Sequence, residues 1–128
     1  MVFAPSSLIL TNYFLPLNGA LYTYMKYGIS FQNKIDICAI NNGVCVLTLV
    51  QYETINESNI ELLQSKLNHY LSYILDGQLE EEEPHKYALP KRIELIVGHK
   101  PTEVLTNFIS QLFPILESES INFVLKTE

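Results

Sequence analysis

The residues of this chain best suited to catalysis or metal binding are two cysteines and three histidines, and their spacing favours neither. His69, His85 and His99 are scattered, whereas closed metal sites use motifs such as His-x-x-x-His or Cys-x-x-Cys. A cysteine nucleophile needs a neighbouring base and an open, electropositive site, but Cys38 and Cys45 stand in apolar runs typical of buried strands. Because the chain also lacks a Gly-x-Ser-x-Gly motif and a glycine-rich phosphate loop, we expect no catalytic residue, metal or cofactor.

The strongest charge cluster is the acidic run Glu80, Glu81, Glu82 and Glu83, which is followed directly by Pro84. Four consecutive like charges repel one another and a proline interrupts regular backbone hydrogen bonding, so the run predicts a solvated loop. General acid and base catalysis needs two carboxyl groups in different environments, one of them desolvated. An exposed run offers the opposite, and contact with a protein partner is its second interpretation.

Three tyrosines are candidate anchors for a partner. Tyr22 and Tyr24 alternate with Leu21 and Thr23, the period of two that predicts a half-buried strand, and Tyr73 falls on a predicted helix. Tyrosine is enriched at interfaces because its ring covers apolar area while its hydroxyl stays hydrogen-bonded. Ordinary packing within the fold is the alternative interpretation for all three.

Composition places the chain among ordinary globular domains and excludes some partners. The 128 residues are 48% apolar and 17% charged, which predicts a single domain over residues 1–128 with one core. Seven lysines and one arginine against fourteen carboxylates give a net charge of −6, which argues against direct nucleic-acid binding. No apolar run reaches the roughly 18 residues of a membrane helix and no signal peptide is evident, so a cytoplasmic protein without a membrane partner is expected.

Residues 34–50 predict a β-hairpin that is apolar on both faces. Asn42-Gly43 favours a type I′ turn because both residues tolerate positive φ. In that register Ile40 faces Cys45, and Asp36 is one of the few polar residues of the hairpin. A hairpin buried on both sides needs covering elements or a partner.

Two helices and two further strands follow. Ser58 and Glu61 fit a capping box at the start of the first helix, with Asn56 as a competing cap, and Pro101 or Thr102 can begin the second. Pro114 should kink or end that second helix. The apolar stripes are Ile60, Leu63, Leu67, Tyr70, Leu71 and Ile74 in the first helix, and Val104, Leu105, Phe108, Ile109, Leu112 and Leu116 in the second.

The remaining strands are Lys91 to Val97 and a C-terminal strand from Ile121, and residues 1–33 form a β-rich extension with strands at 7–14 and 20–31. The order from residue 34 is ββαβαβ. It predicts an α+β fold, with a mostly antiparallel sheet and two helices packed on one face.

Residues 34–126 resemble a family of small uncharacterised bacterial domains, classed as a domain of unknown function. The residues that carry the resemblance are the hairpin with its Asn-Gly-Val turn, the helix at 62–74 with Asp76-Gly77-Gln78 behind it, and the strand at 92–97. The resemblance implies the order of elements and a bacterial setting. It implies no activity.

These features together suggest a non-enzymatic protein-binding domain. A small acidic domain with surplus apolar surface suits a basic protein partner, and its most concrete form is an inhibitor or a toxin-neutralising immunity protein. The alternative is a structural homodimer that assembles through an apolar sheet face or an edge strand. An enzyme with a pocket built from residues distant in sequence is the third hypothesis.

Overall fold

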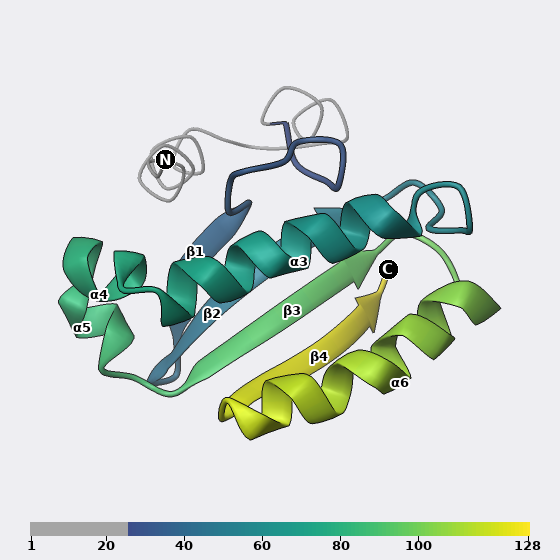
Figure 1. Cartoon of the computed structure of the whole chain (residues 1–128). Helices are drawn as coiled ribbons and strands as arrows, with labels where there is room; N and C mark the ends of the chain where they lie inside the picture. The colour runs from purple at the N-terminus through teal and green to yellow at the C-terminus, as the bar shows by residue number, and fades with distance from the viewer. Residues whose placement is uncertain (1–25) are drawn as a thin grey trace.

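The computed structural model describes residues 26–128, which form one four-stranded sheet covered by helices (Figure 1). The strands lie in the order β1-β2-β3-β4. They are β1 (Ile37–Asn41), β2 (Val44–Gln51), β3 (Lys91–Val97) and β4 (Ile121–Thr127). The helices are α3 (Ile60–Leu75), α4 (Gln78–Glu82), α5 (Pro84–Tyr87) and α6 (Glu103–Ser118).

The predicted hairpin is confirmed in its turn and in its register. Asn42 and Gly43 have φ angles of 52° and 80°, as a type I′ turn requires. Ile40 lies opposite Cys45 in the antiparallel ladder of β1 and β2. Strand β2 is buried on both faces, as its continuous apolar run indicated.

The sheet is mixed, so the expectation of a mostly antiparallel sheet is met only between β1 and β2. Strands β2 and β3 are parallel, and so are β3 and β4. Parallel neighbours need a crossover connection, which α3 to α5 supply for the first pair and α6 for the second. Right-handed crossovers that step across a sheet in one direction place their helices on the same face. The α+β class and the packing of two helices on one face are therefore confirmed (Figure 1).

The core lies between that face and the two long helices. Alternate residues of β2 and β3 point to the helices and are fully buried, and the stripes of α3 and α6 close over them. The strand residues concerned are Cys45, Leu47, Leu49, Ile93, Leu95 and Val97.

The ends of the helices agree with the sequence expectations in part. The N-cap of α3 is Asn59 without a side-chain cap bond, because the Ser58 hydroxyl donates to Asn56 Oδ1 instead of closing a capping box. Thr102 does cap α6, with its hydroxyl accepting from Leu105 N at 3.2 Å. Pro114 does not end α6, which continues to Ser118.

The predictions for two other segments are wrong or concern residues outside the described part of the chain. The acidic run is not a loop, since Glu80 to Glu82 lie in α4 and Glu83 separates α4 from α5. The described end of the predicted strand at 20–31 has turns and bends at residues 26–31, while its earlier part and the strand at 7–14 are outside the described residues. Within residues 26–128 no helix has the length and apolar character that a bilayer crossing requires.

Candidate binding groove between two helices

One flank of α3 is fixed to the segment before β1 by a buried ion pair. Lys66 Nζ lies 2.6 Å from Asp36 Oδ1, and both side chains are 0% exposed. The same ammonium group donates to the carbonyl oxygens of Gly28 and Phe31 at 2.6 and 2.9 Å. Tyr70, one turn further along α3, donates to Thr48 O and accepts from Asp36 N. This flank of α3 therefore faces β1 and residues 28–36.

The hydrogen bonds around the buried pair have the pattern of an ammonium group and a carboxylate. Lys66 Nζ has three acceptors, which only an ammonium group can satisfy with three donors. Asp36 accepts from Lys66 and from the backbone N–H groups of Gly28 and Val50, as a carboxylate does. Burial raises the pKa of Asp36 and lowers the pKa of Lys66, while the attraction between the two charges opposes both shifts.

The opposite flank of α3 is apolar and faces α6. At 100° per residue, Ile60, Leu71 and Leu75 lie on the side of the helix away from Lys66. Ile60 and Leu71 are partly buried against the core. Leu75 is 46% exposed, although it stands beside the core stripe.

Helix α6 presents a matching apolar flank. Val104 shares a pocket with Asn56 and Glu57, which precede α3, so the side of α6 that carries Val104 faces α3. Phe108 and Ile115 follow on the same side of the helix, at four and eleven positions further. Phe113 on the other side packs edge-on against Phe123 of β4, with ring centroids 5.8 Å apart.

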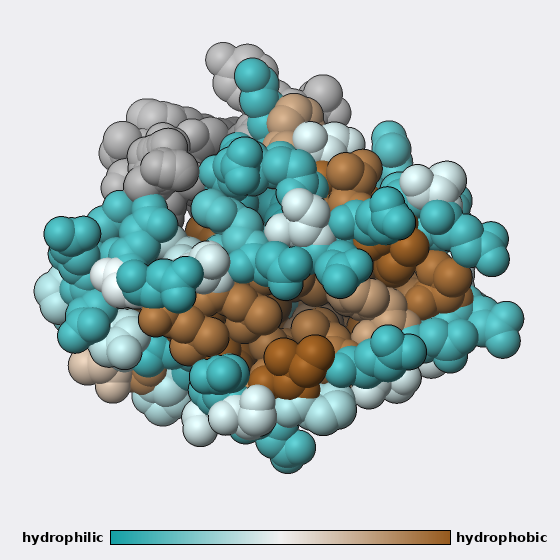
Figure 2. Space-filling view, viewed as in Figure 1, coloured by the Kyte–Doolittle hydropathy of each residue, from teal (hydrophilic) through white to brown (hydrophobic). Residues whose placement is uncertain are grey.

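These two flanks form a continuous apolar groove. The residues of the groove are Ile60, Leu71, Leu75, Val104, Phe108 and Ile115. Ile115 is 54% exposed, the most of any large apolar side chain among residues 26–128. Figure 2 shows the groove as a brown band between the teal outer surfaces of the two helices. The only lysine or arginine in α3 or α6 is the buried Lys66, so neither wall of the groove carries an exposed one.

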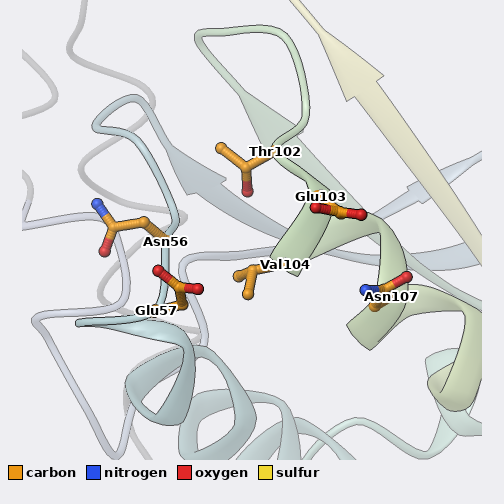
Figure 3. A pocket seen from close by; sticks show the side chains of 6 residues that line it. All are labelled: Asn56, Glu57, Thr102, Glu103, Val104 and Asn107. Carbon is orange, nitrogen blue, oxygen red and sulfur yellow. The ribbon is translucent and has the colours of Figure 1, made fainter.

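One end of the groove is a pocket of about 470 Å³ with acidic walls. It lies between the loop before α3 and the first turns of α6, and Figure 3 shows Glu57 and Val104 facing each other across it. Thr102 joins the two walls, because its hydroxyl also donates to Ile55 O at 2.6 Å. Glu57 and Glu103 are exposed, and no lysine or arginine of residues 26–128 pairs with either. The groove therefore ends on two exposed carboxylates that no lysine or arginine of these residues pairs with.

Of the sequence-predicted partner residues that the structure describes, Tyr73 and Glu82 are in contact. Tyr73 is 1% exposed and donates to Glu82 Oε1, so it lacks the exposure that a surface anchor needs. Its ring faces the core because it belongs to the buried stripe of α3. Tyr22 and Tyr24 lie outside the described residues.

The acidic run is split between surface and fold. Glu80 and Glu81 are exposed on α4, just beyond the end of α3, while Glu82 accepts from Tyr73 and from Gln78. Glu83 is half-buried and pairs with Lys86 at 3.7 Å and His85 at 3.8 Å. Only the first part of the run is therefore fully available to a partner.

Both cysteine thiols are buried, as the strand pattern indicated. The Cys38 thiol donates to the Cys45 sulfur, which raises the pKa of Cys38 and lowers the pKa of Cys45. Lys86, whose ammonium group donates to Cys38 O, also favours the thiolate of Cys45. Within residues 26–128 no group of three or more potential metal ligands comes together.

Sequence reasoning missed the groove and the buried ion pair, although signals for both exist. Leu75 and Ile115 are apolar residues just outside the predicted stripes, and Lys66 is a charged residue inside one. Asp36 stood out as polar in an apolar hairpin. The distance of 30 positions between Asp36 and Lys66 hides their contact.

Comparisons with known proteins identify a family without an assigned role. One family model, described as the family of unknown function DUF6572, matches residues 27–128. The match confirms the resemblance to a small uncharacterised family and begins seven positions earlier than residue 34, so it includes the segment that docks on Lys66. No curated protein and no solved structure matches the chain.

Proposed function

We propose that this chain, which belongs to the family DUF6572, is a protein-binding domain whose partner is a basic protein. The observation that carries the proposal is the groove, an apolar surface left uncovered between two helices that are otherwise packed on the core. Contiguous exposed apolar surface is costly for a soluble domain and marks sites of protein contact.

The charge of the protein supports a basic partner. The net charge is −6, and α3 is bordered by Glu57 before its start and by Glu80 and Glu81 after its end. A negative surface accelerates association with a positive one and disfavours acidic competitors. An inhibitor or a toxin-neutralising immunity protein is the most concrete form of such a domain, because its task is to occupy another protein's basic site.

Self-assembly is the alternative that the same apolar groove favours. A second copy could cover the groove in a symmetric dimer. Charge opposes it, since two copies of −6 would meet along a groove that has no exposed lysine or arginine on its walls.

A matched pair of variants tests the proposal. Ile115→Asp places a charge in the groove, and Ser110→Asp places the same charge on the exposed side of α6. The tagged full chain and both variants are used for affinity capture from a lysate of the source organism, at low and moderate salt, with identification by mass spectrometry. We expect one stoichiometric basic protein with the wild type and Ser110→Asp, weakened by salt and lost with Ile115→Asp.

Two results would contradict it. Equal capture by Ile115→Asp would remove the groove from the binding surface. A dimer mass in light scattering that Ile115→Asp converts to a monomer, without a captured protein, would favour the self-assembling domain instead.

A further inference from the structure

We infer that the groove takes an amphipathic helix of about four turns, with Lys or Arg at the end that reaches Glu57 and Glu103. This inference rests on the proposed function and specifies the part of the partner that binds. It is drawn from the walls, the length and the charge of the groove.

The walls of the groove require an occupant whose backbone is already hydrogen-bonded. Both walls are helices, so their own backbone groups are satisfied internally and only apolar side chains face the groove. An extended segment would bury its N–H and C=O groups against those side chains without partners, at substantial cost. A helix satisfies its backbone internally and can present an apolar stripe at spacings of three and four.

The length of the groove sets the length of the helix. The α3 wall runs from Ile60 to Leu75, a helix of 16 residues. At about 1.5 Å per residue this wall is about 24 Å long. A helix of about 16 residues therefore covers the groove from the pocket to Leu75.

The charge at the pocket determines which end of the bound helix carries a basic residue. Val104 continues the apolar wall into the pocket, and Glu57 and Glu103 stand exposed around it. No lysine or arginine of residues 26–128 pairs with these carboxylates. A basic residue at that end of the bound helix is therefore attracted by both of them. A glutamate or aspartate there would be repelled.

A displayed library of random 16-residue peptides tests the inference even before the partner is identified. The library is selected on the full chain and counter-selected on Ile115→Asp, with Ser110→Asp as a second positive target. We expect enriched peptides with apolar residues at i, i+3 or i+4, and i+7, and with Lys or Arg towards one end. Synthetic copies should gain helicity on binding and lose about thirtyfold in affinity on Ile115→Asp.

The acidic end is tested by charge reversal with a matched control. Glu57→Lys/Glu103→Lys should weaken the selected peptides by about tenfold at low salt, whereas Glu61→Lys/Glu117→Lys, on the outer sides of α3 and α6, should change affinity less than about twofold. Equal effects of the two double variants would overturn the assignment of the basic residue to the pocket end.

Other outcomes separate this inference from the proposed function. Enriched peptides with a period of two, or no enrichment over Ile115→Asp, would overturn the helical occupant. If either occurs while lysate capture still depends on Ile115, the groove remains a protein-binding site with a different ligand. If lysate capture is also independent of Ile115, both the inference and the proposed function fail.

Discussion

Replacing Lys66 by methionine isolates the charge of the buried ion pair, because methionine keeps the apolar stem and removes the ammonium group. The substitution leaves the Asp36 carboxylate fully buried without its counter-charge, and it removes the donor to the carbonyl oxygens of Gly28 and Phe31. Breaking one side of a buried pair typically costs about 3–5 kcal/mol. Since domains of this size are stable by about 5–15 kcal/mol, Lys66→Met should remove a large share of the free energy of unfolding.

The double variant Asp36→Asn/Lys66→Met is the critical comparison. The asparagine oxygen can still accept from Gly28 N and Val50 N, and no unpaired charge remains in the core. We expect the double variant to be destabilised by about 2 kcal/mol less than the sum of the effects of Asp36→Asn and Lys66→Met. Urea unfolding followed by circular dichroism gives the free energies of unfolding of the wild type, Asp36→Asn, Lys66→Met and the double variant, from which the coupling is calculated.

The pH dependence of Lys66→Met gives a second test with a defined sign. Burial raises the pKa of Asp36 in the folded protein, and the variant lacks the Lys66 charge that opposes this shift. A carboxyl group whose pKa is raised on folding stabilises the folded protein below its ordinary pKa, which is about 3.9 for aspartate. This contribution is lost as the pH rises through the pKa of the folded state. Lys66→Met should therefore be less destabilised near about pH 4 than at neutral pH. Additive single effects and a pH-independent difference would refute an ionised pair.

Three further predictions concern the packing of the fold. Gly98→Ala should lower the free energy of unfolding by about 1–3 kcal/mol, because its Cβ would lie 2.6 Å from Tyr52 Cδ1 and 3.1 Å from Tyr52 O. An unchanged melting temperature would contradict that contact. Gly43→Ala should cost about 1 kcal/mol at a φ of 80° in an open turn, measured by the same thermal melt. Cys38 and Cys45 should resist an aromatic disulfide reagent in the folded protein and react on unfolding, so fast native labelling would contradict their burial.

The elements of the fold were predictable where the signal is local. Asn42-Gly43 defines its own turn, and the stripe of α6 follows from a period that needs no tertiary information. The strand at Lys91 to Val97 was predicted with its bounds. The helical conformation of the acidic run was not predicted. Repulsion between exposed glutamates in a single helical turn is weak, and Leu79, buried against the core, holds α4 in place.

The arrangement of the elements was less predictable. Periodicity indicates which side of a strand is buried but not which strand pairs with it. The sequence pattern therefore does not indicate the parallel pairing of β2 with β3. The groove was hidden for a related reason. Leu75 and Ile115 are apolar whether or not α3 and α6 touch, and only the spacing of the helices on the sheet exposes them.

That spacing follows from how each helix is anchored. Lys66 and Tyr70 draw α3 towards β1 and residues 28–36, at one edge of the sheet. Phe113 packs on Phe123 and draws α6 towards β4, at the other edge. The two helices are held towards opposite edges of the sheet (Figure 1), and Leu75 and Ile115 on their inner flanks are exposed. Each Å² of that apolar surface costs about 25 cal/mol in water, a cost that a helix seated in the groove would remove.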